Sequence, residues 1–334
     1  MPPSKNHVAT SSTSFQPQGV CIIGAGLMGH ALAVVHANIG LTVTLIDSNP
    51  DQVNNAKALV RRVFETLVRA EEISPASAKE NQERISYTTD LSLALKSHNF
   101  IIEAVTEKVN VKEDLYKKID ETAPKNAVIC SNTSYLNIFS LVPSRRLENS
   151  VITHWYTPPY IIDLIDIVPS NPSIPDLANS VCSFYRKHNK KPLFFKRFIP
   201  GYIANRLQSA LNLEAFSLLE NEQVTPEDID QSIKHGLALR LMLLGHMKKA
   251  DFTGLEMVKN GLASGSYKPP KATTSSKVLD ALVNSGHTGV QTGKGFYDYH
   301  GVPTHDLFTQ RDLQLIELKR LSQRAFNGKG LDND

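Results

Sequence analysis

Short apolar runs alternate with longer amphipathic stretches over the first two hundred residues. The runs at 20–23 and 41–46 are rich in β-branched residues, and the stretch between them, 27–39, has helical spacing. Strand, helix and strand in this order are typical of a βαβ unit in a parallel sheet. Residues 50–80 then predict one or two charged helices. Further short runs predict strands at 100–105, 127–130, 151–155 and 164–168. The pattern therefore predicts an α/β fold with a doubly wound N-terminal domain.

The pattern changes after Pro200, where apolar residues begin to recur at helical spacing and strand-like alternation nearly disappears. Thr225 followed by Pro226 and Asp228 has the form of a helix start, with a cap, an N1 proline and a first-turn acid. The first seventeen residues are rich in Ser, Thr and Pro. We therefore expect a disordered leader at 1–17, an α/β domain at 18–197 and an all-α domain at 198–330.

Composition excludes several classes of protein. Thirty-six Lys and Arg against thirty-three Asp and Glu give a net charge of +3, too small to predict a nucleic-acid surface. No apolar run reaches the ~18 residues of a membrane span. The leader lacks the apolar segment of a secretory signal. It also has one Lys and no Arg, which is atypical of a mitochondrial presequence. Two of three cysteines lie in apolar runs, as expected for buried thiols. A cytoplasmic location is predicted, with a mitochondrial one as the alternative.

A glycine-rich segment, GAGLMG, follows the first predicted strand and opens the first predicted helix. In this context three glycines allow a tight turn, close approach of a pyrophosphate and close helix–strand packing. The helix N-terminus adds free N–H groups and a positive dipole end. The expected cofactor contacts in this segment are Gly24, Gly26, Leu27, Met28 and Gly29.

Asp47 ends the second predicted strand, where a carboxylate can bind the ribose hydroxyls of a dinucleotide. Ser48 and Asn49 follow it, so no basic residue is present to bind a 2′-phosphate. The sequence therefore predicts NAD rather than NADP. A plain glycine turn with a surface aspartate is the alternative.

His154 and Asp166 lie at or in two predicted strands, and strand ends on one edge of a parallel sheet converge near the cofactor crevice. A histidine paired with a carboxylate suits removal of a proton from an alcohol. Asp163 is a rival partner, and a core histidine without catalytic function is the alternative. Ser134 could bind a substrate hydroxyl or oxyanion, or could be an ordinary turn serine or helix cap.

Several motifs in order after residue 18 resemble the 3-hydroxyacyl-CoA dehydrogenase family. They are GxGxMG with Met28, EAVTEK at 103–108, SNTS at 131–134, the HxxxPPY…LxD block from His154, PGYIANRL at 200–207, TPEDID at 225–230 and TGKGFYDY at 292–299. The resemblance implies a Rossmann domain followed by a helical domain like the C-terminal domain of 6-phosphogluconate dehydrogenase. It also implies a homodimer.

The resemblance also implies roles for individual residues. His154 corresponds to the catalytic base, Asp166 stands where the family usually has Glu, and Ser134 corresponds to the serine that binds the substrate oxygen. Asn205 corresponds to the substrate-binding asparagine of the helical domain, acting across the interdomain cleft, although a capping or structural asparagine is the alternative. The residues expected to line the cofactor are Glu103, Glu107, Lys112 and Asn132. No metal is expected.

The chain departs from the family pattern at three positions. Asp166 is one methylene shorter than Glu, so its strand must lie closer to His154 or a water must bridge. Thr157 replaces the usual Asn of the H-x-x-N-P block, and His246 follows Gly245 where the family usually has Pro. These departures motivate an alternative hypothesis, a catalytically weak NADH-binding homologue with a structural or regulatory function, as in a crystallin.

The sequence leaves two classes of substrate open, a free 3-hydroxy acid and a 3-hydroxyacyl-CoA. Pro158-Pro159-Tyr160 and the segment 236–245 resemble the lambda-crystallin and L-gulonate 3-dehydrogenase branch. Basic residues after the ribose acid could hold a CoA phosphate or could form a solvated helix face; they are Arg61, Arg62, Arg69 and Lys79. The leading prediction is an NAD-dependent oxidoreductase that converts a 3-hydroxy acid or a 3-hydroxyacyl-CoA to the 3-oxo product by His-assisted hydride transfer.

Overall fold

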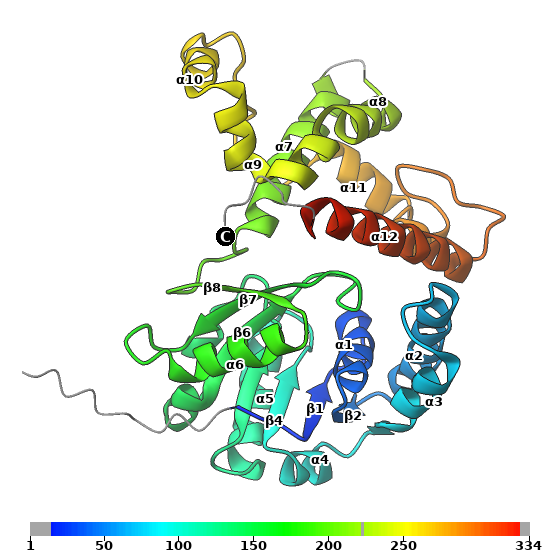
Figure 1. The fold of residues 1–334 in the computed structure, drawn as a ribbon, viewed down its shortest axis with the longest axis vertical. Helices are drawn as coiled ribbons and strands as arrows, with labels where there is room; N and C mark the ends of the chain where they lie inside the picture. Colours follow the sequence, from blue (N-terminus) through cyan, green and yellow to red (C-terminus); the bar gives the residue numbers. More distant parts are fainter. Residues whose placement is uncertain (1–14, 222–223, 328–334) are drawn as a thin grey trace, which may run out of the picture. The chain divides into compact units, whose positions relative to one another are not determined.

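The computed structural model describes residues 15–221 and 224–327, so positions 1–14 of the expected leader lie outside the described residues. The chain divides into two compact units, Met1–Tyr202 and Ile203–Asp334. The first is an α/β unit and the second is helical (Figure 1). The predicted fold class is confirmed. The predicted limits at 17 and 197 stay predictions, and within the expected leader Phe15 packs edge to face on Phe100 and Phe184.

The first unit is built on one eight-stranded sheet with the order β3-β2-β1-β4-β5-β6-β7-β8. Its strands are β1 (Gly19–Ile23), β2 (Thr42–Ile46), β3 (Ile85–Thr88), β4 (Phe100–Glu103), β5 (Val128–Ser131), β6 (Ser150–Trp155), β7 (Leu164–Pro169) and β8 (Lys191–Phe194). The first six strands are parallel and have the doubly wound order, which reverses between β1 and β4. Ligands of such sheets bind beyond the carboxyl ends of the strands at this reversal.

Among the described residues of the first unit, six α-helices accompany the sheet: α1 (Leu27–Asn38), α2 (Pro50–Arg69), α3 (Pro75–Glu83), α4 (Leu91–Ser97), α5 (Val109–Thr122) and α6 (Asp176–Lys187). Two 3₁₀ turns, Ile138–Ser140 and Ser144–Asn149, precede β6. The charged stretch 50–80 thus forms two helices. Each begins with proline behind a side-chain cap, Asn49 for α2 and Ser74 for α3.

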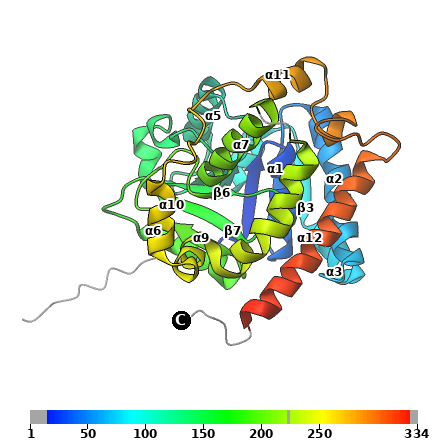
Figure 2. The ribbon, with the colours of Figure 1, turned by 90° about the horizontal axis from the view of Figure 1, so that it is seen from above.

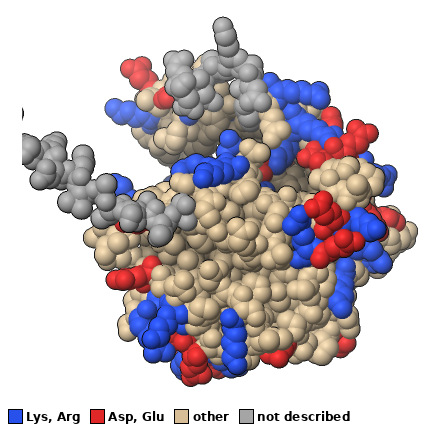
Figure 3. Space-filling view, turned by 60° about the horizontal axis from the view of Figure 1, so that its bottom comes forward, with Lys and Arg blue, Asp and Glu red and all other residues tan. Residues whose placement is uncertain are grey.

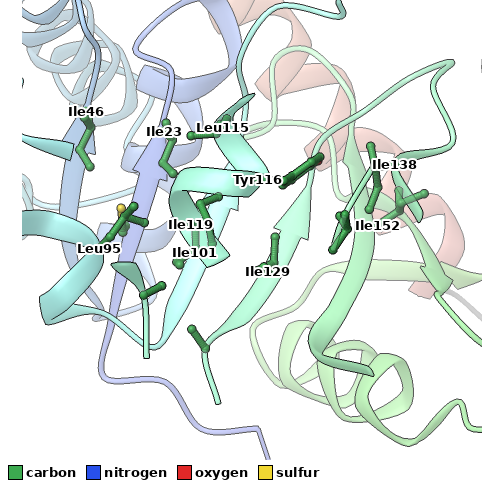
Figure 4. Packing of buried hydrophobic residues seen from close by; sticks show 14 of the residues in the cluster. Ile23, Ile46, Leu95, Ile101, Leu115, Tyr116, Ile119, Ile129, Ile138 and Ile152 are labelled. Atoms are coloured by element: carbon green, nitrogen blue, oxygen red, sulfur yellow. The ribbon is translucent and has the colours of Figure 1, made fainter. Parts of the chain in front are cut away.

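Alternating strand residues pack against helices on opposite faces of the sheet. On one face, Ile23, Ile101, Ile129 and Ile152 come from four neighbouring strands and belong to one buried cluster with residues of α5 (Figure 4). The α5 members are Leu115, Tyr116 and Ile119. Each buried aliphatic side chain of this size contributes about 1.5–3 kcal/mol, so this core fixes the strand ends that carry the polar residues described below.

The opposite face has a cluster of aromatic rings from α1, β6 and α6. The His36 ring lies 5.7 Å from Trp155 and 5.9 Å from Tyr185. His36 Nε2 lies 3.0 Å from the Tyr185 hydroxyl, and Nδ1 lies 2.8 Å from the carbonyl of Leu32. Burial, followed by the nearby Lys190 and His188, lowers the pKa of His36 to about 4 despite the bond to Leu32. His36 is therefore neutral in the folded protein at pH 7.

We expect His36 to make the folded protein sensitive to mild acid. The unfolded chain takes up a proton near pH 6.5 and the folded chain only near pH 4. The stability from neutral His36 is therefore present above pH 6.5 and is lost as the pH falls. Between pH 7 and pH 5 this residue alone costs about 2 kcal/mol. Urea unfolding followed by the fluorescence of Trp155, the single tryptophan, measures the loss. His36→Gln should remove that share, and an unchanged pH dependence in the variant would contradict the assignment.

Two features of the sheet differ from the sequence prediction. Strands β3 and β8 were not expected, because their residues are only partly apolar and both strands lie at sheet edges. Strand β7 pairs with β6 in the antiparallel direction. The expectation that His154 and Asp166 meet because parallel strand ends converge is therefore wrong: they meet because they are directly opposite in an antiparallel pair.

The second unit consists of helices connected by turns. They are α7 (Ala204–Asn221), α8 (Pro226–Gln231), α9 (Leu239–Thr253), α10 (Leu255–Ala263), α11 (Lys277–Asn284) and α12 (Thr304–Asn327), with a π-helical segment at Ser232–Ala238 and a 3₁₀ turn at Val290–Thr292. The long red helix in Figure 2 is α12. The helix start predicted at Thr225 is a capping box, with Thr225 and Asp228 bonded reciprocally.

The surface charges in Figure 3 lie in small groups that include both signs. Along the helices several form pairs one turn apart, such as Arg84 with Glu80 at 2.6 Å and Arg61 with Glu65 at 3.7 Å. Exposed pairs of this kind contribute at most about 1 kcal/mol each. Among the described residues, no helix has both the length and the apolar character needed to cross a membrane.

Candidate active site

The glycine loop between β1 and α1 is packed tightly against backbone on one side. Gly24 has φ +101°, and a Cβ there would lie 2.6 Å from the carbonyl oxygen of Ala104. A Cβ on Gly29 would lie 1.7 Å from the carbonyl oxygen of Gly24. Glycine is therefore required at both positions by the contact of the loop with itself and with the segment after β4.

The other side of the loop is open. A Cβ on Gly26 would meet no atom within 4 Å, and Gly26 caps α1 without a side-chain hydrogen bond. Leu27, on the first turn of α1, is 67 % exposed. Free N–H groups, the positive end of the helix dipole and space above a glycine are the features that a pyrophosphate requires. This loop fits the phosphates of NAD.

Asp47 follows β2 directly and is held beside the glycine loop. Its Oδ2 accepts a hydrogen bond from the Ala25 N–H at 2.9 Å, and its Oδ1 accepts one from Asn49 at 3.0 Å. The carboxylate is half-buried and carries no basic neighbour in the sequence that follows. The arrangement suits the ribose hydroxyls of NAD and offers nothing for a 2′-phosphate.

A fully buried ion pair supports the loops at the ends of β4 and β5. Lys112 of α5 lies 2.7 Å from Glu103 Oε1, and the two side chains are 1 % and 0 % exposed. Tyr116 and Ser131 donate to Glu103 Oε2 at 2.8 and 2.6 Å, and the Val105 N–H donates to Oε1. Glu103 and Lys112 are therefore too deeply buried to contact a ligand directly. They hold neighbouring groups in place instead.

One of those groups is Glu107, which is partly exposed and 3.3 Å from Lys112. Its Oε1 accepts hydrogen bonds from the backbone N–H groups of the loop after β5 and from the Thr133 hydroxyl; the N–H donors are Ser134, Tyr135 and Leu136. Burial raises the pKa of Glu107, but the bonds from Tyr135 and Thr133 and the charge of Lys112 outweigh it and hold the pKa below its ordinary value. An ionised Glu107 therefore fixes the loop that carries Ser134.

His154 and Asp166 form a buried pair across β6 and β7. His154 Nδ1 lies 3.1 Å from Asp166 Oδ2, and the side chains are 4 % and 1 % exposed. Because His154 and Asp166 are register partners in the antiparallel pair, the shorter aspartate reaches the imidazole directly. Asp163, the rival partner, lies 3.2 Å from Lys190. His154 Nε2 makes no hydrogen bond with a described residue, which leaves it available for a substrate proton.

Two tyrosines complete the surroundings of His154, and the sequence analysis missed both. The Tyr156 hydroxyl donates to Asp166 Oδ2 at 2.6 Å, and its ring meets His154 edge to face at 4.6 Å. The Tyr202 ring stacks on His154 at 4.5 Å, and its hydroxyl donates to the carbonyl of Thr133 at 2.6 Å. The two-residue period of strands could have indicated that Tyr156 shares a face with His154. No local signal could have indicated Tyr202.

The other predicted residues lie at different places. The Asn132 side-chain oxygen accepts from the Trp155 N–H at 2.8 Å and so ties the loop after β5 to β6. The Ser134 carbonyl accepts from the N–H of Gly201 at 3.0 Å, and the Ser134 hydroxyl makes no hydrogen bond with a described residue. Thr157 Oγ1 lies 3.1 Å from the sulfur of Met28. Asn205 lies on the first turn of α7, in the second unit.

Comparison with known proteins places the chain in a family. The family described as "3-hydroxyacyl-CoA dehydrogenase, NAD binding domain" matches residues 19–198, and "3-hydroxyacyl-CoA dehydrogenase, C-terminal domain" matches residues 201–299. A 5-formyl-3-hydroxy-2-methylpyridine 4-carboxylate 5-dehydrogenase from Mesorhizobium japonicum is 27 % identical over 305 residues, 91 % of this chain and 98 % of that protein. The lambda-crystallin homolog of Bos taurus is 29 % identical over 245 residues, 71 % of this chain and 75 % of that protein.

A solved structure shares the whole fold. The crystal structure described as 5-formyl-3-hydroxy-2-methylpyridine 4-carboxylic acid 5-dehydrogenase, an NAD⁺-dependent dismutase, superposes with a TM-score of 0.82 at 24 % identity. The match covers 92 % of this chain and 99 % of that one. The match of residues 19–198 to an NAD-binding domain defines an NAD-dependent oxidoreductase. The chain belongs to the 3-hydroxyacyl-CoA dehydrogenase family.

Proposed function

We propose that this protein oxidises a secondary alcohol β to a carboxyl or thioester group, with His154 as the base that takes the hydroxyl proton. The observation that carries the proposal is the direct contact of His154 Nδ1 with the buried Asp166 carboxylate at 3.1 Å. A carboxylate on Nδ1 fixes the tautomer in which Nε2 is unprotonated, and it stabilises the imidazolium that forms.

The proton and the hydride leave the substrate separately. His154 Nε2 receives the hydroxyl proton while the C–O bond becomes a carbonyl. Bound NAD supplies the acceptor for the hydride that leaves the same carbon. Asp166 keeps its place on Nδ1 throughout. The stacked ring of Tyr202 keeps the imidazole from rotating.

Ser134 and Asn205 are the groups that we propose to hold the substrate oxygen. The Ser134 hydroxyl has no partner among the described residues and lies in a loop fixed by the four hydrogen bonds to Glu107 Oε1. A hydroxyl on such a fixed loop is suited to polarise a developing carbonyl, because no reorganisation is needed when charge forms. Asn205 is assigned by the family resemblance of PGYIANRL.

The loop geometry and the family resemblance support the proposed cofactor-binding residues. The open face of Gly26 and the first turn of α1, with Leu27 and Met28, would hold the pyrophosphate, and Asp47 the ribose. Glu107 and the amide of Asn132 would line the nicotinamide side. Glu103 and Lys112 would act through Glu107, because both are fully buried.

We propose a free 3-hydroxy acid, rather than a CoA thioester, as the preferred substrate. The relative from Mesorhizobium carries in its name a ring carboxylate and no CoA. Of the basic residues that could bind a CoA phosphate, Arg61 is paired with Glu65 on the exposed face of α2. A solvated helix face accounts for this pair without a ligand.

A substrate panel tests both the reaction and the preference. NADH consumption should be followed with acetoacetyl-CoA, free 3-oxo acids, dehydro-sugar acids and a formylpyridine carboxylate. We expect at least about tenfold higher kcat/KM for a free acid than for the thioester, the range that pocket contacts supply. Rapid turnover of acetoacetyl-CoA alone would overturn the preference. Tight NADH binding without turnover of any compound would favour the second candidate, a catalytically weak NADH-binding homologue.

A homodimer and a cytoplasmic location complete the proposal. Large apolar side chains of the second unit are exposed in the single chain, as expected for a surface that another copy covers; they include Met247, Met257, Leu255 and Leu262. The proposed location is based on the composition of residues 1–17.

A further inference from the structure

One oxygen of Asp166 accepts two hydrogen bonds. Oδ2 lies 2.6 Å from the Tyr156 hydroxyl and 3.1 Å from His154 Nδ1. The other oxygen, Oδ1, is buried and has no partner among the described residues. The carboxylate is therefore held from one side by two donors on β6 and the residue that follows it, and Tyr156 makes the shorter bond.

The two donors also contact each other. The Tyr156 ring meets the imidazole edge to face, with centroids 4.6 Å apart and planes at 77°. Tyr202 stacks on the imidazole at 23°. The titratable groups around His154 are Asp166 from β7, Tyr156 after β6 and Tyr202 before α7, with Glu107 and Tyr135 further out. Asp166 is the one that contacts a nitrogen of the imidazole.

A hydrogen bond to a carboxylate changes how strongly that carboxylate stabilises a positive charge on its other partner. A short O–H···O⁻ bond is charge-assisted and draws negative charge toward the donor. The carboxylate then stabilises a neighbouring imidazolium less, so the histidine holds its proton less tightly. Burial first, and then the bond to Asp166, raises the pKa of Tyr156, so its hydroxyl stays protonated and remains a donor at any pH at which the enzyme works.

We propose that Tyr156 is a positioning residue: its hydroxyl fixes the Asp166 carboxylate and lowers the proton affinity of His154. The inference rests on the proposed function of His154 as the base. A base must be free to accept a proton, and a carboxylate that is also held by a second donor attracts that proton less strongly. The hydroxyl of Tyr156 contributes to the reaction through Asp166 and His154 and does not itself touch the reacting atoms.

Tyr156→Phe tests the proposal in the full-length enzyme with NAD. The variant keeps the ring and loses the bond to Asp166. In a plot of kcat/KM against pH, the fall on the acid side (the acid limb) should therefore move to higher pH by about half to one unit. The plateau should change by less than about tenfold. The titration of the His154 Cε1–H signal, followed by NMR without substrate and assigned by its absence in His154→Gln, should move by the same amount in the same direction.

Tyr185→Phe is the matched control. It also removes one tyrosine hydroxyl that makes a hydrogen bond, but this hydroxyl is bonded to His36 at 3.0 Å and lies on the opposite face of the sheet. It should lower stability and leave the acid limb in place. An acid limb and an NMR titration that stay in place in Tyr156→Phe, or move to lower pH, overturn the inference. Undiminished turnover in His154→Gln would instead overturn the proposed function on which it rests.

Discussion

Replacing His154 with glutamine is expected to lower kcat by about 10²- to 10⁴-fold, the range attributed to general acid–base catalysis. The affinity for NADH should stay within about twofold of the unchanged enzyme, because a loss of proton transfer does not remove binding contacts. The structural reason is that Asp166 occupies Nδ1 at 3.1 Å and leaves Nε2 as the nitrogen that can accept a proton. Glutamine fills a similar volume and can still donate to Asp166, but it is not a base.

The loss is measured as steady-state turnover on the best compound of the panel, with NADH affinity from its own fluorescence. His98→Gln is the control, since His98 is a partly buried histidine of the first unit that caps the end of α4 and bonds to the carbonyl of Ala94. It should retain normal kcat. If His154→Gln turned over at the unchanged rate, His154 would have no part in the reaction and the proposed mechanism would be wrong.

Replacing Lys112 with methionine is expected to destabilise the protein by about 3–5 kcal/mol, the cost of leaving a buried charge without its partner. The 2.7 Å bond from Lys112 compensates a Glu103 carboxylate that is 0 % exposed. Without it, the carboxylate must take up a proton or unfold its surroundings. The change in the free energy of unfolding is measured by urea titration at pH 7. NADH affinity should also fall, because Glu107 loses its nearest cation.

The same helix provides the control. Lys117 lies 3.8 Å from Asp114, and both side chains are about two-thirds exposed. Lys117→Met should change stability by less than about 0.5 kcal/mol. Adding Glu103→Gln to Lys112→Met should recover part of the loss, because a neutral pair needs no compensating charge. Equal losses of unfolding free energy in Lys112→Met and Lys117→Met would show that the buried pair stabilises the protein no more than an exposed pair does.

The cofactor loop could be predicted from the sequence because its requirements are local. The turn at Gly24, the contact of Gly29 with Gly24 and the position of Asp47 after the next strand all arise within one βαβ unit. The change from alternating to helical spacing near Pro200 likewise indicated the second kind of unit. Hydrophobic periodicity reports which face of an element is buried, and that is enough for fold class.

The site around His154 needed contacts that the sequence does not encode locally. Nothing in the segment 164–169 indicates that β7 runs against β6, since both are short apolar runs. The buried ion pair of Lys112 with Glu103 could not be predicted from the sequence either. A lysine on a charged helix is expected to be exposed to solvent, and only the packing of the helix on the sheet buries it. Tyr202 follows β8 in the sequence, and a turn at Gly201 places its ring on the imidazole of His154.

The class of fold, the glycine loop and the candidate base could all be predicted from residues that lie close together along the chain. The position of that base depends on contacts between separate strands. The antiparallel register places Asp166 directly opposite His154, which turns the shorter aspartate into a direct partner. It also brings the hydroxyl of Tyr156 to the same oxygen. Register and packing fix such distances through contacts between separate strands, and these contacts follow from the fold as a whole.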